Sequence, residues 1–206
     1  MLLPRLYAIV DAACFRDEDA LFAHARELAG AGVTMLQYRN KAGSSRQMLA
    51  QARELRRIFP RPAKLIFNDR ADLCLAADFD GVHVGQDDLS PEGARAVIGP
   101  DRWLGLSTHN PEQVRAADQA DATYIAIGPV FATASKANPD PVVGVEGLRA
   151  ARALTRKPLV AIGGITRANC RQVMEAGADS VAVISDLLSA PRRAAEEFMR
   201  LVNDDS

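Results

Sequence analysis

Short hydrophobic runs alternate along this chain with longer segments in which apolar residues recur at helical spacing. The runs are continuous rather than alternating, as is typical of parallel strands covered on both faces. We expect strands at residues 5–10, 34–38, 64–67, 81–84, 103–107, 123–127, 158–162 and 180–184. We expect helices at residues 17–30, 45–59, 69–77, 91–97, 111–119, 145–155, 167–176 and 190–203.

The segments between the runs carry the signals of amphipathic helices. In the second of them, Leu49, Ala52 and Leu55 fall on one helical face, as packing against a sheet requires. Ser90 and Asn110 each stand directly before a proline at the start of a predicted helix. A short polar residue followed by proline favours a helix N-terminus, so these two residues are predicted N-caps.

Regular strand–helix units without a break in composition predict an α/β fold, a single (β/α)₈ TIM barrel. We expect residues 1–206 to form one catalytic domain of this kind, because no linker or low-complexity segment interrupts the pattern. The alternative is an open, doubly wound sheet. It is disfavoured because no GxGxxG motif follows the first strand.

The composition and charge limit the classes of partner that this chain is expected to bind. The net charge of −1 argues against a nucleic acid or an anionic membrane surface, either of which calls for excess Lys and Arg. The apolar stretch before residue 15 is too short and interrupted to span a membrane. Cys14, Cys74 and Cys170 form no CxxC pair, which favours reduced thiols and a cytoplasmic location. We therefore expect small-molecule substrates, and a homo-oligomer is left open.

Polar side chains gather where the predicted strands end. Gln37, Arg39 and Lys41 occupy alternate positions after the second strand, so they can share one side of an extended segment. A guanidinium fork and an ammonium group suit phosphate oxygens. Because the carboxyl ends of barrel strands meet at one mouth, these cations predict a phosphate site there. The alternative for this segment is a solvated strand end.

Carboxylates follow the next two strands. Asn68 and Asp69 end the third strand, and Asp87 and Asp88 follow the fourth. Mg²⁺ typically binds one or two carboxylates together with substrate phosphates, so Asp69 and Asp88 are predicted metal ligands. Read singly, Asp69 suits a helix N-cap and Asp88 a turn.

Two further segments suit phosphate. The stretch 128–144 lacks a clear period and carries Thr133, Ser135 and Lys136, as expected of a functional loop. Gly164 follows the seventh strand and Ser185 the eighth, where barrels often bind phosphate through backbone amides.

The motifs taken together resemble the thiamine-phosphate synthase family over nearly the whole chain. Those that carry the resemblance, in order, are residues 36–41 (LQYRNK), 68–70 (NDR), 81–88 (GVHVGQDD), 105–109 (GLSTH), 128–136 (GPVFATASK), 161–165 (AIGGI) and 183–185 (VIS). The resemblance implies a TIM barrel that joins hydroxymethylpyrimidine diphosphate to thiazole phosphate with Mg²⁺. The implied products are thiamine phosphate and pyrophosphate, and the implied mechanism is dissociative.

The resemblance also implies residue roles. The pyrimidine diphosphate would be contacted by Gln37, Arg39, Lys41, Asn68, Ser107 and Lys136, with Tyr38 and Asn40 in the same binding segment. The thiazole phosphate would be bound by Thr133, Ala134, Ser135, Gly164, Ile184 and Ser185. Asp69 and Asp88 would hold Mg²⁺, and the catalytic residues would be Arg39, Lys41, Ser107 and Lys136.

Some positions depart from the family pattern. Tyr38 stands where an aliphatic residue is usual, Ala132 where proline often precedes the threonine, and Asn138 where an acid is often found. These touch loop shape more than charge.

Two other functions are weighed against this one. The first is a thiazole tautomerase of the same barrel family, with His109 as acid and base. The second is a non-catalytic barrel that binds phosphate ligands.

His83 lies inside an apolar strand, which favours a packing role.

Overall fold

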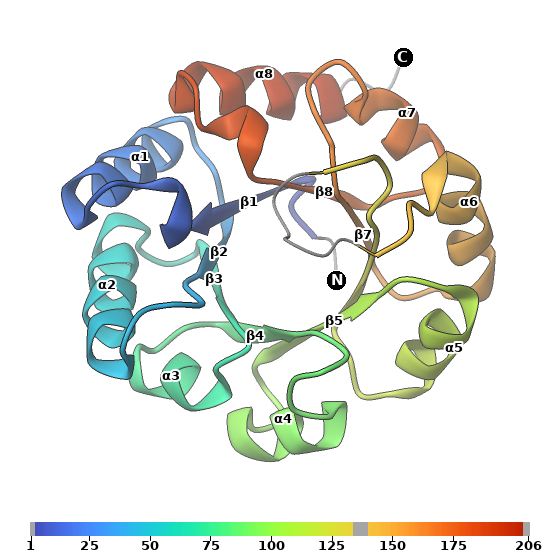
Figure 1. Cartoon of the computed structure of the whole chain (residues 1–206), viewed down its shortest axis with the longest axis horizontal. Helices are drawn as coiled ribbons and strands as arrows, with labels where there is room; N and C mark the ends of the chain where they lie inside the picture. Colours follow the sequence, from blue (N-terminus) through green and yellow to red (C-terminus); the bar gives the residue numbers. More distant parts are fainter. Residues whose placement is uncertain (1–2, 134–139, 204–206) are drawn as a thin grey trace.

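The computed structural model describes residues 3–133 and 140–203, and its centre is a closed barrel of parallel strands (Figure 1). The strands are β1 (Leu6–Asp11), β2 (Met35–Arg39), β3 (Lys64–Asn68), β4 (Gly81–Val84), β5 (Trp103–Thr108), β6 (Tyr124–Ile127), β7 (Leu159–Ile162) and β8 (Ser180–Val183). Each strand pairs with the next in sequence, and β1 pairs with β8, with Leu6 opposite Val181. The predicted TIM barrel is confirmed.

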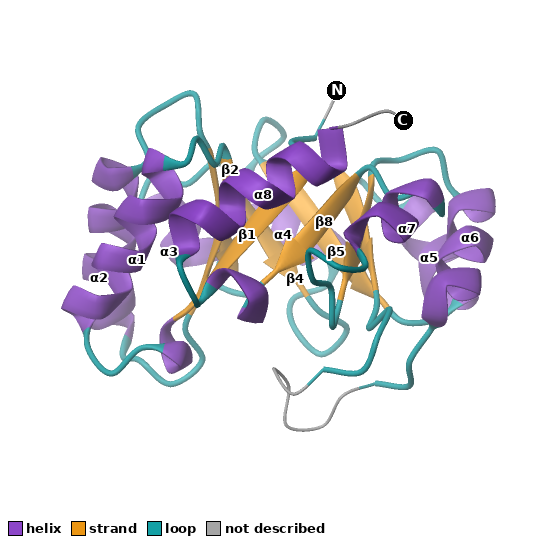
Figure 2. Cartoon of the chain, turned by 90° about the horizontal axis from the view of Figure 1, so that it is seen from above, coloured by secondary structure: helices purple, strands orange, loops and turns teal. Residues whose placement is uncertain are grey.

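A ring of helices surrounds the barrel (Figures 1 and 2). They are α1 (Glu18–Gly30), α2 (Ser45–Ile58), α3 (Ala71–Ala76), α4 (Pro91–Ile98), α5 (Pro111–Gln119), α6 (Gly144–Leu154), α7 (Cys170–Glu175) and α8 (Pro191–Asn203), with the 3₁₀ turns η1 (Ala12–Cys14) and η2 (Ser185–Leu187). The predicted caps are confirmed. Ser90 Oγ accepts from Gly93 N at 3.1 Å, and Asn110 Oδ1 accepts from Gln113 N at 2.9 Å. Among the described residues, no helix has the length and apolar character needed to cross a membrane.

Two predicted helices begin two or more residues later than expected. The third was expected from Asp69, but α3 starts at Ala71 because Asp69 adopts a left-handed backbone with φ of 62°. The seventh was expected from Arg167, whereas α7 starts at Cys170 after a turn closed by Asn169 Oδ1, which accepts from Thr166 N at 2.7 Å. In both places the backbone after the strand is used to present groups at the barrel mouth.

The core has two layers. The larger lies between the strands and the surrounding helices, and contains residues such as Leu36 and Phe198. The smaller fills the inside of the barrel, where Tyr7, Met35 and Tyr124 pack together. A filled interior leaves room for a ligand only at an end of the barrel.

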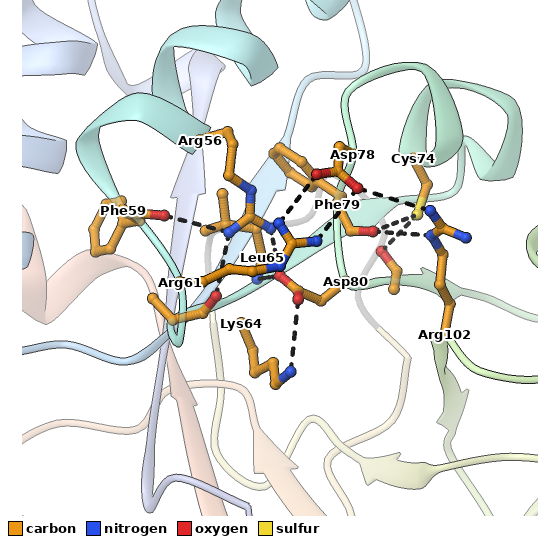
Figure 3. A network of polar contacts seen from close by, with 12 residues as sticks. Arg56, Phe59, Arg61, Lys64, Leu65, Cys74, Asp78, Phe79, Asp80 and Arg102 are labelled. Carbon is orange, nitrogen blue, oxygen red and sulfur yellow. Dashed lines mark hydrogen bonds and ion pairs between the residues drawn. The ribbon is translucent and has the colours of Figure 1, made fainter.

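An ion-pair network lies beside the starts of β3 and β4 (Figure 3). Asp80, directly before β4, pairs with Arg56 from α2 and lies 3.6 Å from Lys64 Nζ at the start of β3. It also accepts from Leu65 N at 2.9 Å. Asp78 pairs with Arg61 at 3.0 Å beside this cluster. These bonds hold strand and helix ends together on the face opposite the carboxyl ends of the strands.

Candidate active site

A cavity of about 520 Å³ opens where the strands end, and every strand or the loop after it contributes to its wall. Most of the predicted site residues meet here. Those that line the cavity are Gln37, Arg39, Lys41, Asn68, Asp69, Asp88, Ser107, Thr133, Gly164, Ile184 and Ser185. Ala134, Ser135 and Lys136 lie outside the described residues.

Strand alternation decides which residues of the QYRNK segment face the cavity. Gln37 and Arg39 point inward, so Tyr38 between them points outward and is fully buried. The Tyr38 hydroxyl bonds Gln51 of α2, and Asn40 Nδ2 donates to the same Gln51 at 3.1 Å. The side chains of Tyr38 and Asn40 therefore face α2 and do not line the cavity, unlike Gln37, Arg39 and Lys41 of the same segment.

Cations and carboxylates are interleaved on one side of the mouth. Arg39 is ion-paired with Asp11, the last residue of β1. Lys41 Nζ lies 2.7 Å from Asp69 Oδ2 and is about half exposed. In this wall each of the two cations is thus paired with one carboxylate. Lys41 also remains in contact with solvent, from which an anionic ligand can approach.

Asp69 and Asp88 face each other across the β3 and β4 loops. Burial raises the pKa of Asp69, the hydrogen bond with Lys41 opposes the shift, and the neighbouring Asp88 carboxyl raises the pKa further. Asp88 Oδ2 accepts from Gly85 N at 2.8 Å, which fixes that carboxyl. Two acids this close favour a shared proton or a cation between them.

The donor set suits a hard cation that keeps part of its coordination for a ligand. Oxygen donors are what Mg²⁺ prefers, and two carboxylates are enough when substrate phosphates complete the shell. No group of three or more His, Cys, Asp or Glu that could hold a metal is present among the described residues. The facing carboxylates of Asp69 and Asp88 offer oxygen donors of this kind at the cavity.

The ends of β7 and β8 form the opposite wall. Gly163 and Gly164 both have left-handed backbones, with φ of 99° and 64°. A Cβ on Gly164 would lie 2.5 Å from the Ala132 carbonyl oxygen and 2.7 Å from Phe131 Cβ. Glycine is required here because the β7 loop passes directly under the residues that precede Thr133.

His83 and His109 both line the cavity. Burial lowers the pKa of His83 to about 4, so its ring is neutral at physiological pH. His109 Nδ1 donates to the Gly128 carbonyl at 2.6 Å, and its Nε2 lies 3.5 Å from Asp140 Oδ2. His109 therefore joins the end of β5 to both described ends of the 128–144 loop.

Sequence reasoning missed four polar residues of the wall, namely Tyr7, Gln86, Gln113 and Asp140. Tyr7 carried no local signal, because the sequence does not show which face of β1 points inward; in the structure Tyr7 shares that face with Ile9, two positions further on. Gln86 Nε2 donates to the Ser107 carbonyl at 2.6 Å, a contact between neighbouring loops that no local pattern indicates.

A barrel mouth with interleaved cations and acids on one wall and glycine-rich strand ends on the other defines an enzyme of the phosphate-binding TIM-barrel class. The thiamine monophosphate synthase family model matches residues 6–187. The thiamine-phosphate synthase of Koribacter versatilis is 64% identical over 204 residues, covering 98% of this chain and 97% of that one. The chain therefore belongs to the thiamine-phosphate synthase family, whose members are transferases of thiamine biosynthesis.

Two other comparisons agree. The thiamine-phosphate synthase of Chloroflexus aurantiacus is 43% identical over 202 residues, covering 97% of this chain and 93% of that one. Among solved structures, the thiamine phosphate pyrophosphorylase from Pyrococcus furiosus superposes with a TM-score of 0.86 at 34% identity, covering 97% of this chain and 95% of that one.

Proposed function

We propose that this chain joins hydroxymethylpyrimidine diphosphate to thiazole phosphate, releasing pyrophosphate and forming thiamine phosphate by a dissociative mechanism. One observation carries the proposal: Lys41, Asp69 and Asp88 meet on one wall of the cavity, opposite the Gly164 wall. The first wall suits a diphosphate with its cation, and the second suits a monophosphate. Two separated phosphate subsites are what this pair of substrates requires.

The diphosphate is assigned to the β2–β3–β4 wall. Arg39 supplies a planar fork and Lys41 a point charge toward its oxygens, with Lys136 as the third proposed cation. In a dissociative reaction negative charge builds on the departing diphosphate, so cations preset around it lower the barrier. No strong general base is needed at this stage. Substituting Lys for Arg39 would keep the charge but lose the two-pronged contact.

Asp69 and Asp88 would hold Mg²⁺ against the same diphosphate. When bound, the ion would neutralise charge that develops on the leaving group. The chain's own part is to keep two carboxylates in place: the Gly85 amide fixes Asp88 at 2.8 Å, and Lys41 contacts Asp69 at 2.7 Å. A cation between these acids would also offset the burial and, with it, the repulsion from Asp88 that raise the pKa of Asp69.

The thiazole phosphate is assigned to the β7–β8 wall. Its proposed contacts are Thr133, Ala134, Ser135, Gly164, Ile184 and Ser185. The close approach of Gly164 to the Phe131–Ala132 backbone leaves no room for a side chain, which supports binding through backbone groups. Gln37, Asn68 and Ser107 remain for the pyrimidine side of the cavity. We also propose a cytoplasmic reaction, which the free thiols of Cys14, Cys74 and Cys170 support.

A coupled assay for pyrophosphate release tests the proposal. The purified chain receives both substrates with Mg²⁺, and a parallel sample receives a chelator. Pyrophosphate appearing only with Mg²⁺ and both substrates supports the transferase. Isomerised thiazole phosphate without pyrophosphate would instead indicate the tautomerase, in which His109 acts as acid and base. Binding of the product without any turnover would indicate the non-catalytic barrel.

A further inference from the structure

A run of hydrogen bonds crosses the inside of the barrel beneath the cavity. Its members, from β2 through β1, β6 and β4 to β5, are Gln37, Tyr7, Tyr124, His83 and Ser107. We call this set the buried polar chain. The successive distances are 2.8, 2.9, 3.0 and 2.8 Å. Gln37 and Ser107, its two ends, both line the cavity.

The fold makes room for the bond between Tyr124 and His83. Gly105 lies in β5 beneath the two rings, and a Cβ there would lie 2.3 Å from the Tyr124 hydroxyl and 2.4 Å from His83 Nδ1. Glycine inside a strand often marks such a close approach. The His83 and Tyr124 rings are stacked, with centroids 5.6 Å apart. The contact is therefore built into the barrel.

Proton counting gives the buried polar chain a direction. Gln37 Nε2 donates to the Tyr7 hydroxyl, so the single proton of Tyr7 is free to go to Tyr124. Tyr124 in turn has one proton, which it donates to His83 Nδ1. A neutral ring that accepts at Nδ1 carries its hydrogen on Nε2, and donates it to Ser107 Oγ. The Ser107 hydrogen is then left for the cavity.

Charge states support this reading. Burial raises the pKa of Tyr7 and of Tyr124 well above their usual value, so both hydroxyls keep their protons. His83 is buried, and both of its ring nitrogens bond hydroxyl groups rather than a carboxylate, so the ring carries one hydrogen. Each link thus has one proton, and reversing any bond would reverse all of them.

We propose that the amide orientation of Gln37 sets the tautomer of His83 through the buried polar chain, and so makes the Ser107 hydroxyl a donor to the bound ligand. The same orientation also determines what the Gln37 end of the chain offers to a ligand. Because its Nε2 donates to the Tyr7 hydroxyl, Gln37 presents its carbonyl oxygen to the cavity as an acceptor. The cavity then selects a ring edge that offers a donor to Gln37 and an acceptor to Ser107. Applied to the pyrimidine diphosphate, this specificity rests on the proposed function, whereas the assigned tautomer of His83 does not.

Nitrogen NMR of the three histidines in the ligand-free chain tests the tautomer directly. The His83 signals are assigned from their absence in His83→Gln. In the wild-type chain at neutral pH we expect hydrogen on Nε2 and an unprotonated Nδ1, whose resonance lies far downfield. A hydrogen on Nδ1 instead would overturn the proposal. The only variant that must fold for this test is His83→Gln, which is used to assign the signals.

Coupling along the chain is tested with Gln37→Glu. An ionised carboxylate can only accept, so Tyr7 would donate to it and every later bond would reverse. We expect the hydrogen of His83 to move from Nε2 to Nδ1 once the carbon resonance of the introduced carboxylate shows ionisation. Adding Tyr7→Phe cuts the connection, and the double variant should return to Nε2–H. An ionised carboxylate with an unchanged tautomer would refute the coupling.

A kinetic comparison tests the consequence for the ligand. Tyr124→Phe removes the link to His83, and should raise the Michaelis constant for the pyrimidine diphosphate about five- to tenfold, while that for thiazole phosphate stays within about twofold. Thr108→Val is the matched control: it removes a buried hydroxyl next to Ser107 that donates to the Ala126 carbonyl at 2.9 Å. It should leave both constants unchanged. An unchanged pyrimidine diphosphate constant in Tyr124→Phe would refute donor presetting at Ser107, without affecting the assignment of the reaction.

Discussion

Gly164→Ala probes the strand end assigned to the thiazole phosphate. The substitution has two costs. A non-glycine residue in the left-handed region costs about 1–2 kcal/mol, and forcing a methyl group against packed atoms costs about a further 1–3 kcal/mol. The second cost arises because the added Cβ would lie 2.5 Å from the Ala132 carbonyl oxygen, which belongs to the backbone and has little freedom to move aside.

Gly32→Ala separates the two costs. Gly32 also has a positive φ, of 90°, but an added Cβ there meets nothing within 4 Å. It should therefore lose only the backbone contribution, and the entropic gain from removing a glycine in the unfolded chain is common to both variants. We expect the melting temperature of Gly164→Ala to fall about 5–15 °C, and to fall several degrees more than that of Gly32→Ala.

Thermal unfolding and steady-state kinetics on both variants measure the outcome. Relief of the contact should push the Phe131–Ala132 backbone, and Thr133 with it, away from Gly164, so the Michaelis constant for thiazole phosphate should rise in Gly164→Ala alone. Equal loss of stability in the two variants would show that the close approach carries no cost. A rise confined to the pyrimidine diphosphate would mean that the two phosphate walls are assigned the wrong way round.

Three further changes test other parts of the molecule. Asp88→Asn should reduce pyrophosphate release by orders of magnitude at saturating Mg²⁺ while the melting temperature holds or rises, because one of two opposed carboxyls is removed; unchanged turnover would disprove the metal assignment. Arg39→Lys should raise the Michaelis constant for the pyrimidine diphosphate about tenfold and spare that for thiazole phosphate, and equal effects on both would count against the fork contact. Burial lowers the pKa of His24 to about 4 from 6.5, so the unfolded chain takes up the proton first as pH falls. His24 should therefore account for about 1–3 kcal/mol of the fall in the free energy of unfolding between these pH values, and a His24→Leu variant with an undiminished fall would contradict this cause.

The barrel was predictable because local sequence patterns indicate each strand–helix unit. Continuous apolar runs, N-caps such as Ser90 and helical faces such as that of Leu55 are properties of neighbouring residues. Their order then permits few topologies. The late start of α3 was not predictable in this way, because Asp69 takes a left-handed backbone that the helical pattern after it does not reveal.

Site residues at strand ends were predictable for a similar reason, since the parallel topology brings such ends together. Gln37, Arg39 and Asp88 reach the cavity as expected. Contacts inside the barrel were not predictable, because they depend on the register between strands far apart in sequence. Tyr7 and Tyr124 are an instance: each looks like an ordinary aromatic residue in its own strand, and only the closed barrel brings their hydroxyls to 2.9 Å.

The pairing of β1 with β8 has a consequence for how the chain is made. Leu6 is synthesised early, yet its partner Val181 leaves the ribosome only after nearly all the other strands, on the order of ten seconds or more later. Until then both edges of the growing sheet expose unpaired amides and carbonyls, which can bind the strands of other nascent chains. Completion of the barrel is therefore a late event, and the yield of the protein in a cell should depend on how well its open edges are shielded during translation.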